Sequence, residues 1–162
     1  MSIKVGDRLP VAEFLEKGPE GVAPVPSDAL FSGRKVVLFA VPGAFTGICS
    51  TQHVPSFIRT REAILAKGVD EIVCVAVNDP FVMAAWSEAT GARAAGIRML
   101  ADADARFTKA LGLASTFPQH GMIDRSARYA MLVEDGVVTI FNPEVARGVC
   151  ELSAGETLLG ML

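Results

Sequence analysis

The stretch from Pro42 to Cys49 carries the residues whose types and spacing best fit catalytic chemistry. It reads Pro-Gly-Ala-Phe-Thr-Gly-Ile-Cys and stands between an apolar run at 36–41 and a helical pattern. A strand that passes through a glycine-containing turn into a helix brings unpaired backbone N–H groups and the positive end of the helix dipole to one point. Such a point favours a thiolate, the nucleophilic form of cysteine, and Thr46 adds a hydroxyl one turn earlier. We therefore predict that Cys49 is a nucleophile, against the alternative of a small buried hydrophobic residue.

The elements around this stretch alternate between strands and helices. Apolar runs and helical spacing predict, in chain order, strands at 35–41, 71–77 and 97–100 and helices at 49–67, 81–90 and 104–111. Strands separated by helices imply parallel pairing. Two further strands, 128–133 and 137–141, flank Asp135-Gly136, a pair typical of an antiparallel hairpin. The predicted fold is therefore α/β, with a mixed central sheet and helices on both faces.

The boundaries of these elements have their own signals. Prolines and glycines predict a loop-rich segment over residues 1–34. Pro55 should kink the helix at 49–67 near its start, or separate a first turn that carries Cys49 from the longer body. Asp79 followed by Pro80 predicts a capped helix start. Ser153-Ala-Gly-Glu156 predicts a capping box that opens a final helix.

Length and composition limit the classes of function. The 162 residues fit one domain, which we predict to span 1–162, and 51% hydrophobic with 20% charged residues indicates a compact protein. A net charge of −3 without a Lys/Arg cluster argues against nucleic acid and anionic membranes as partners. No apolar signal region opens the chain, and no apolar stretch is long enough to span a bilayer. We therefore expect a soluble, cytoplasmic protein.

The cysteines and histidines do not form a metal-binding pattern. Three cysteines without a Cys-x-x-Cys pair fit neither a disulfide framework nor a structural zinc site. Cys49 and His53 share a helical face, but Cys74, His120 and Cys150 are far away in the sequence. We expect no metal and no cofactor. His53 could act as a base, but a thiolate needs none, so a surface or structural role is the preferred interpretation, and His120 is expected in a loop.

The order of motifs resembles that of the peroxiredoxins, specifically the type II or peroxiredoxin-5-like subgroup. Pro42-Gly-Ala-Phe-Thr46-x-x-Cys49-Ser50 is similar to the active-site signature of that family. The similarity extends over nearly the whole chain, through Val5-Gly6-Asp7, Lys35-Val36-Val37-Leu38-Phe39, Val77-Asn78-Asp79-Pro80-Phe81-Val82-Met83 and Arg128-Tyr129-Ala130-Met131-Leu132-Val133. It implies a thioredoxin-like fold, in agreement with the element order above.

The resemblance also implies roles for particular residues. Cys49 corresponds to the peroxidatic cysteine, Thr46 to the threonine that orients the peroxide, and Pro42 to the proline that shields the site. Arg128 corresponds to the catalytic arginine. Arg125 is close enough in the sequence to compete for that role, but the position of Arg128 at the start of the hairpin strand favours Arg128.

Two positions depart from the family pattern. Gly47 stands where proline is common, and Ile48 where threonine is frequent. Gly47 loosens the loop and Ile48 makes the mouth of the site more apolar, which affects the expected rate and substrate preference. Phe45 and Phe117 are candidates to line that mouth, with the core as the alternative, and Trp86 is expected in the core or at an interface.

The resemblance implies a thiol peroxidase that reduces hydrogen peroxide and small organic hydroperoxides through a sulfenic acid on Cys49, and it implies a homodimer. One alternative is a thiol–disulfide oxidoreductase on the same fold, against which the missing Cys-x-x-Cys counts. Another is a redox-responsive binding or holdase protein with little turnover. The set of Thr46, Cys49 and Arg128 favours turnover.

The remaining cysteines bear on how the sulfenic acid is reduced. Cys74 lies inside an apolar strand and is expected to be structural. Cys150 is the better internal partner, but it falls about two positions before the resolving cysteine of some relatives, and in a strand that shift moves a side chain by ~6.6 Å. A disulfide tolerates only ~4.4–6.8 Å between Cα atoms. We therefore predict a one-cysteine cycle with an outside thiol, either glutathione with glutaredoxin or thioredoxin.

Overall fold

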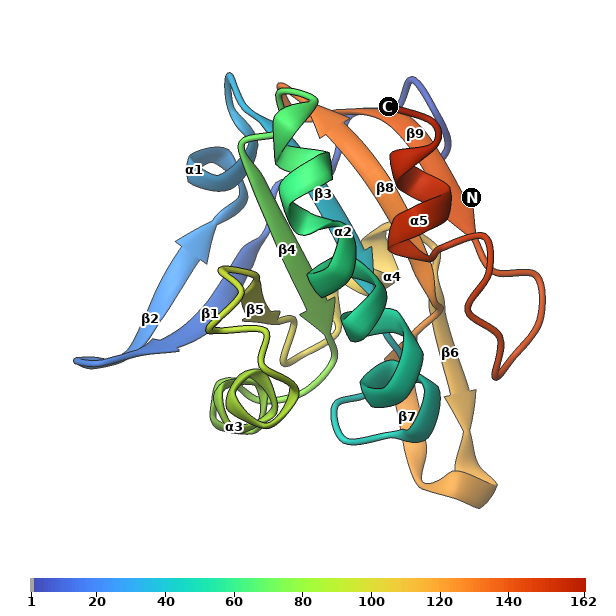
Figure 1. Cartoon of the computed structure of the whole chain (residues 1–162). Helices are drawn as coiled ribbons and strands as arrows, with labels where there is room; N and C mark the ends of the chain where they lie inside the picture. The colour runs from blue at the N-terminus through green and yellow to red at the C-terminus, as the bar shows by residue number, and fades with distance from the viewer. Residues whose placement is uncertain (1) are drawn as a thin grey trace.

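A seven-stranded sheet with strand order β2-β1-β5-β4-β3-β8-β9 forms the centre of the protein (Figure 1). The structure is a computed structural model and describes residues 2–162. Its elements are β1 (Glu13–Gly18), β2 (Gly21–Pro26), α1 (Ser27–Phe31), β3 (Lys35–Ala40), the π-helix η1 (Cys49–His53), α2 (Val54–Ala66), β4 (Glu71–Ala76), α3 (Pro80–Thr90), β5 (Arg98–Ala101), α4 (Arg106–Ala110), β6 (Ala114–Phe117), the 3-10 turn η2 (Pro118–His120), β7 (Met122–Ser126), β8 (Tyr129–Glu134), β9 (Val137–Pro143) and α5 (Gly155–Leu159).

The pairing of these strands confirms the mixed sheet that the sequence predicted. β3 pairs with β4, and β4 with β5, in parallel, whereas β8 runs antiparallel to both β3 and β9. In the β3–β8 pair, Ala40 lies opposite Tyr129. Arg128 immediately precedes β8. This register therefore places Arg128 next to the C-terminal end of β3, close to the loop that begins at Pro42.

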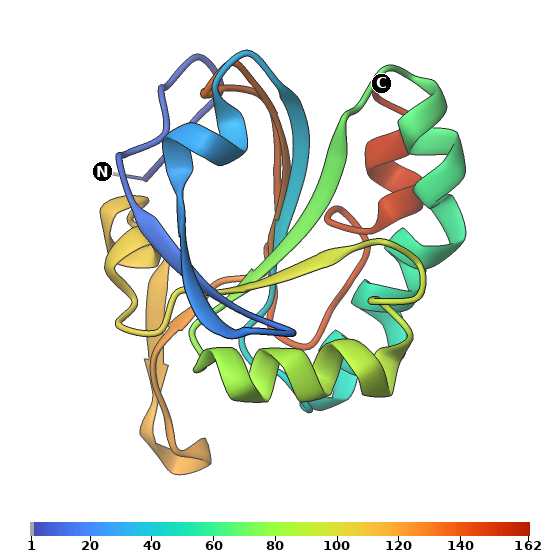
Figure 2. The same ribbon diagram turned by 90° about the vertical axis from the view of Figure 1, so that its left-hand side faces the viewer.

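Alternating side chains of β3 supply two apolar layers. Val37 and Phe39 belong to one buried cluster, which includes residues of α2, α3 and α5. Val36 and Leu38 belong to a second cluster, which includes residues of α1 and α4. Figure 2 shows α2 and α5 on one side of the sheet and α1 and α4 on the other. The prediction of helices on both faces is therefore confirmed, because a strand buried on both faces needs cover on each.

The prediction of a loop-rich segment over residues 1–34 is wrong from residue 13 onward. β1 and β2 form a hairpin in which Glu13 lies opposite Pro26 and Gly18 opposite Gly21. β2 is one of the two edge strands of the sheet, and a strand at the edge tolerates prolines because one side of its backbone needs no partner. The prolines that suggested a loop are compatible with a strand for this reason.

A second hairpin, β6–β7, was also missed. It forms a separate two-stranded sheet in which Ala114 lies opposite Ser126, and it projects from the main body (Figures 1 and 2). η2 closes its tip and contains His120, which the sequence placed in a loop. Each strand is short, so its pattern of apolar residues is too weak to stand out in the sequence.

Proline divides the helical segment that follows the site loop. The backbone N–H of Val54 bonds to the carbonyl oxygen of Cys49, a five-residue span that defines the π-helix η1. Pro55 follows at the start of α2 and has no N–H to donate. The prediction that Pro55 separates a first turn carrying Cys49 from the longer helix is confirmed.

Two local signals at other boundaries are confirmed as well. The Asp79 side chain accepts a hydrogen bond from the backbone N–H of Val82 at 2.8 Å, and Pro80 opens α3. At the β8–β9 turn, Asp135 and Gly136 have φ values of 49° and 77°, the left-handed conformations that such a hairpin turn requires.

The capping box predicted at Ser153 is wrong. α5 begins at Gly155 after an uncapped Ala154. The Ser153 hydroxyl donates instead to Glu144 at 2.8 Å, and Glu156 pairs with Arg59 at 2.8 Å. Both side chains therefore bind partners in other segments of the chain and do not form the local hydrogen bonds of a capping box.

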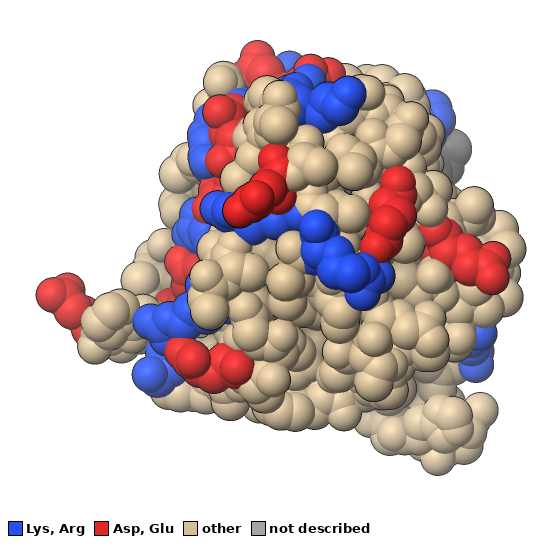
Figure 3. All heavy atoms as spheres, in the orientation of Figure 1, with Lys and Arg blue, Asp and Glu red and all other residues tan. Residues whose placement is uncertain are grey.

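Charged side chains of both signs are interspersed on the face drawn in Figure 3, and most of its lower part is uncharged. This face has no continuous basic surface of the kind that binds nucleic acid. Within residues 2–162, every helix is too short or too polar to cross a bilayer.

Candidate active site

The Cys49 sulfur lies between a hydroxyl and a guanidinium group. Thr46 Oγ1 is 2.9 Å from Sγ, and Arg128 Nη2 donates to Sγ at 3.2 Å. Thr46 lies in the loop after β3, Cys49 begins η1, and Arg128 immediately precedes β8. The structure therefore brings together the three side chains that the sequence singled out. Because Cys49 is 1% exposed and Arg128 8%, solvent screens their interaction only weakly.

The hydroxyl of Thr46 has two acceptors within reach. Its oxygen is 2.7 Å from the carbonyl oxygen of Gly43 and 2.9 Å from Cys49 Sγ. A hydroxyl carries one proton, so it donates to one acceptor at a time. It can bond to Gly43 while a thiol S–H donates to its oxygen, and it can turn toward the sulfur when the sulfur is a thiolate. The hydroxyl can thus serve the sulfur in both protonation states.

His53 holds the other side of the Arg128 guanidinium. Arg128 Nη1 lies 3.0 Å from His53 Nδ1, and His53 Nε2 lies 3.0 Å from the carbonyl oxygen of Ser153. Arginine only donates and a carbonyl only accepts, so these partners assign the proton to Nε2 and leave Nδ1 as the acceptor. Burial, together with the charge of Arg128, lowers the pKa of His53 to about 3. The imidazole is therefore neutral near pH 7 and acts as an acceptor for the arginine.

This contact corrects part of the interpretation of His53. The residue is fully buried, so the surface role is wrong. Its bond to Arg128 was not anticipated. The i, i+4 spacing of Cys49 and His53 was the signal that could have revealed it, because two side chains on one helical face can approach the same third residue.

Two polar contacts fix the loop that carries Thr46. Ala44 N–H donates to Asn78 Oδ1 at 3.0 Å, and Trp86 Nε1 donates to Ser50 Oγ at 2.9 Å. Phe45, between these anchors, has a φ of 60°, which is strained for a bulky residue, and its side chain is 58% exposed. Phe45 thus belongs to the surface and not to the core.

A pocket of about 530 Å³ opens beside this constellation. Its wall includes Pro42, Thr46 and Arg128 at the reacting end, with Ile48 and Phe117 among the apolar residues. Phe117 and Ile48 line the mouth as the sequence suggested, whereas Phe45, the other candidate, is not part of the lining. The pocket gives a small molecule access to the two side chains that contact the sulfur.

Arg125, the competing arginine, contacts the loop elsewhere. Its Nη1 would be 3.0 Å from a Cβ atom placed on Gly43, so its guanidinium packs against the Gly43 backbone. The contact with Cys49 Sγ belongs to Arg128.

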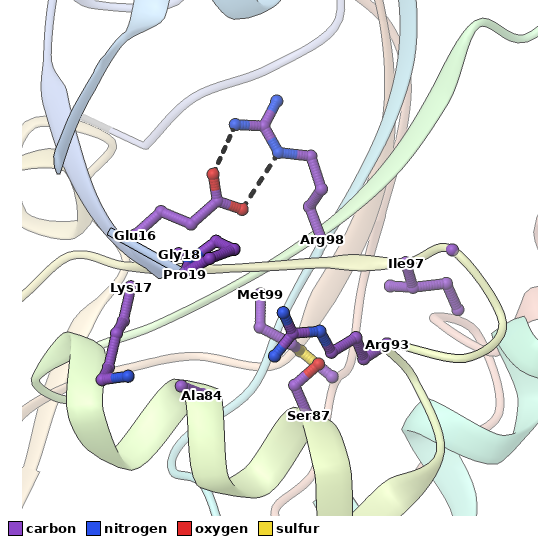
Figure 4. A pocket seen from close by; sticks show the side chains of 11 residues that line it. Glu16, Lys17, Gly18, Pro19, Ala84, Ser87, Arg93, Ile97, Arg98 and Met99 are labelled. Atoms are coloured by element: carbon purple, nitrogen blue, oxygen red, sulfur yellow. Dashed lines mark hydrogen bonds and ion pairs between the residues drawn. The ribbon is translucent and has the colours of Figure 1, made fainter. Parts of the chain in front are cut away.

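A second pocket, of about 330 Å³, lies between β1, α3 and β5 (Figure 4). Arg98 points away from α3 and donates from Nη2 to Glu16 Oε1 at 2.8 Å and from Nε to Oε2 at 3.1 Å. The carboxylate of Glu16 raises the pKa of Arg98 further above its usual range. Neither cysteine nor histidine lines this pocket, so it offers no thiol for peroxide chemistry.

The other two cysteines are separate free thiols. Cys74 is fully buried in β4, opposite Phe39, and burial raises its pKa well above the usual value. Cys150 lies between β9 and α5, outside any strand, so the strand geometry used to judge its reach does not apply. Partial burial raises its pKa, and it lines a third pocket, of about 220 Å³, with Thr51 and Ser56.

Comparisons with known proteins agree on one family. Residues 4–159 match the family described as Redoxin. The chain is 44% identical over 161 residues to Peroxiredoxin-2E-2, chloroplastic, of Oryza sativa subsp. japonica, covering 97% of this chain and 72% of that protein. It is 42% identical to Peroxiredoxin-2B of Arabidopsis thaliana, covering 99% and 98% of the two chains. The solved structure of reduced Prx3 from Vibrio vulnificus in complex with hydrogen peroxide superposes with a TM-score of 0.91, at 49% identity and 98% coverage of both chains.

The sheet, its helices and these similarities define a thioredoxin-like fold. The chain belongs to the redoxin family, as a peroxiredoxin of the type II, peroxiredoxin-5-like subgroup. It is a thiol-dependent peroxidase, an oxidoreductase that reduces a peroxide and is itself reduced by a thiol. None of these relatives favours the alternatives of a thiol–disulfide oxidoreductase or a holdase.

Proposed function

We propose that Cys49 is the peroxidatic nucleophile, that Thr46 and Arg128 act directly on the peroxide, and that Pro42 shields the site. The observation that carries this assignment is the position of Sγ, 2.9 Å from the hydroxyl oxygen of Thr46 and 3.2 Å from a guanidinium nitrogen of Arg128, two residues that line the pocket. The proposal treats residues 1–162 as one domain, a view that the family match over residues 4–159 supports.

The reaction follows from this geometry. The Cys49 thiolate attacks the terminal oxygen of a hydroperoxide, so an S–O bond forms while the O–O bond breaks. The products are a sulfenic acid on Cys49 and an alkoxide, or hydroxide from hydrogen peroxide, which takes up a proton. Arg128 stabilises the thiolate first and then the charge that develops on the leaving oxygen, without losing its own proton. The Thr46 hydroxyl can accept from and donate to the peroxide, which holds the O–O bond in line with the sulfur.

Pro42 contributes by its shape. It is half-buried, lines the pocket next to Thr46 and has no N–H group. An apolar ring at this place limits the access of water to the sulfur. Exclusion of water strengthens the charge interactions on which the attack depends.

An outside thiol completes the cycle in this proposal. It attacks the sulfenic sulfur of Cys49, releases water and leaves a mixed disulfide, which a second thiol reduces. Cys74 is enclosed in the sheet and Cys150 lines a different pocket, so both observations support a one-cysteine cycle. Glutathione with glutaredoxin is the proposed reductant, with thioredoxin as the second candidate.

We also propose that the protein is a homodimer and acts in the cytoplasm. Phe45 is 58% exposed and Phe81 60%, and they lie on two segments joined by the bond between Ala44 and Asn78. Large exposed apolar side chains on neighbouring segments favour a protein–protein contact. Sedimentation of the wild type and of Phe45→Glu tests the dimer, since a charge in a buried contact should shift the protein toward the monomer. Relatives include chloroplastic and mitochondrial proteins, so fractionation of the source cells is the test of location.

A peroxide-consumption assay with a thiol donor tests the assignment of the nucleophile. Cys49→Ser should lose turnover while its circular dichroism spectrum matches the wild type. Cys150→Ser is the matched control and should retain turnover. Wild-type turnover in Cys49→Ser would show that another residue carries the reaction, and disulfide reduction without peroxide consumption would favour the oxidoreductase alternative.

A further inference from the structure

The pocket beside Cys49 is much larger than hydrogen peroxide needs. Its volume is about 530 Å³, whereas one water molecule occupies ~30 Å³ in the liquid. Beyond Thr46 and Arg128 the wall is mainly apolar and includes Ile48, Phe117, Met122 and Val145. Space and lining of this kind fit an alkyl chain attached to the hydroperoxide, since apolar surface is stabilised where it leaves water.

Arg147, a cation of this pocket, has no carboxylate partner in the described part of the chain. The guanidinium carbon of Arg147 lies 3.2 Å from the centroid of the Phe117 ring, and both residues line the pocket. Among residues 2–162, no carboxylate lies within 4.0 Å of Arg147. A guanidinium stacked on an aromatic ring keeps its N–H groups in its own plane, where they remain free to bind a planar anion.

The other charged groups of the pocket are already engaged. Arg128 bonds to His53 and to Cys49. Glu144, the acidic residue of the wall, accepts at Oε1 from the backbone N–H groups of Glu151 and Ser153 at 2.7 Å each and from the Ser153 hydroxyl at 2.8 Å. These bonds hold its carboxylate toward the segment before α5. Arg128 acts on the hydroperoxide itself, so Arg147 is the cation of the wall that can pair with a second group of the ligand.

We propose that Arg147 makes the pocket selective for hydroperoxides that carry a carboxylate on an apolar chain. The chain lies against the apolar wall, the hydroperoxide reaches Cys49, and the carboxylate accepts two parallel N–H bonds from Arg147. This inference rests on the peroxidase chemistry of Cys49 and adds no new reaction step. It concerns which peroxide is held best.

The test compares a hydroperoxy acid of medium chain length with its own methyl ester, so that the two substrates differ only in the carboxylate. Reduced protein is mixed with either one in stopped-flow, without any thiol, so that reductant binding does not enter the measurement. The fluorescence of Trp86, the single tryptophan, reports the oxidation because its indole N–H bonds to Ser50, the neighbour of Cys49. The rate with hydrogen peroxide, measured for every variant, is its internal reference.

Arg147→Gln should lower the acid-to-ester rate ratio about three- to tenfold, the range expected for one partly solvated ion pair, and Arg147→Lys should keep part of it. The control is Arg106→Gln, an exposed arginine paired with Asp104 outside the pocket, which should leave the ratio unchanged. An unchanged ratio in Arg147→Gln, or an equal fall in Arg106→Gln, would overturn the proposal. A wild type that does not react with hydrogen peroxide would instead contradict the assignment of Cys49.

Discussion

Arg128 donates to two acceptors at once, the Cys49 sulfur at 3.2 Å and the imidazole of His53 at 3.0 Å. The two bonds come from different guanidinium nitrogens, so together they fix both the position and the plane of the group. Because His53 is anchored in turn to the Ser153 carbonyl, the orientation of the arginine depends on a segment more than 100 residues away from Cys49 in the sequence.

The two arginines near the site should differ strongly in their effect on rate. Arg128→Gln removes the charge next to the sulfur, and loss of one preorganised donor costs on the order of 10²-fold in rate. Arg125→Gln should change the rate far less, because Arg125 packs on Gly43 and not on Sγ. Single-turnover oxidation by hydrogen peroxide measures both variants. The reverse order of effects would move the role to Arg125.

Removal of the acceptor on His53 should weaken catalysis without removing a reacting group. His53→Leu leaves one face of the Arg128 guanidinium without a partner, and a hydrogen bond to a charged group contributes ~1.5–3 kcal/mol, so the rate should fall about tenfold or more. His53→Gln restores an acceptor and should recover part of the rate. Equal rates in both variants would show that the imidazole only fills space.

The stability of the fold should depend on pH through His53. Its pKa is about 3 in the folded protein and 6.5 in the unfolded chain. Between these values the unfolded state binds a proton that the folded state does not, so the free energy of unfolding must fall as the pH drops from about 6.5 toward 3. Above pH 6.5 the residue is neutral in both states and contributes no slope. The full effect is on the order of 5 kcal/mol.

Urea unfolding at several pH values measures this slope. His53→Gln should flatten it between pH 6.5 and 4 even if its stability is lower at every pH. His120→Gln, at the exposed hairpin tip, is the matched control and should keep the wild-type slope. A wild-type slope in His53→Gln would assign the acid sensitivity to other groups.

The hydroxyl of Thr46, and not its methyl group, should matter for the rate. Thr46→Val keeps the shape but removes the donor that lies 2.9 Å from Sγ, and the expected loss is about 10²-fold in single-turnover oxidation. Thr46→Ser keeps the hydroxyl and should stay within about tenfold of the wild type. Similar losses in both variants would point to packing by the methyl group as the cause.

The parts of the site that lie close together in the sequence were predictable. Pro42, Thr46 and Cys49 occupy one turn between a strand and a helix, and local chemistry is enough to single out the cysteine. Arg128 was assigned by resemblance, because its approach to the sulfur depends on the antiparallel register of β3 and β8. The bond between His53 and Arg128 was missed for a similar reason, since both hydrogen-bond partners of His53 come from distant segments.

In the fold, too, features set by local contacts were predictable and features set by distant contacts were not. Asp79, Pro55 and the Asp135-Gly136 turn act on the backbone of near neighbours and gave correct predictions. The prolines of β2 suggested a loop because the edge position that tolerates them follows from the whole sheet. Ser153 suggested a cap, but Glu144 offers its hydroxyl a partner that local sequence does not reveal.

The fate of the sulfenic acid separates a one-cysteine cycle from an internal disulfide. After one equivalent of peroxide, mass spectrometry of the wild type should find oxidised Cys49 without a disulfide to Cys150, and added glutathione should convert it to a mixed disulfide. Cys74→Ser with Cys150→Ser should retain turnover with glutathione and glutaredoxin, since Cys74 is enclosed in β4 and Cys150 lines a pocket apart from that of Thr46 and Arg128. The single Cys150→Ser variant is the control for any loss of packing at Cys74. A Cys49–Cys150 disulfide in the wild type, together with lost turnover in the double variant, would instead require the segment between β9 and α5 to move during each cycle.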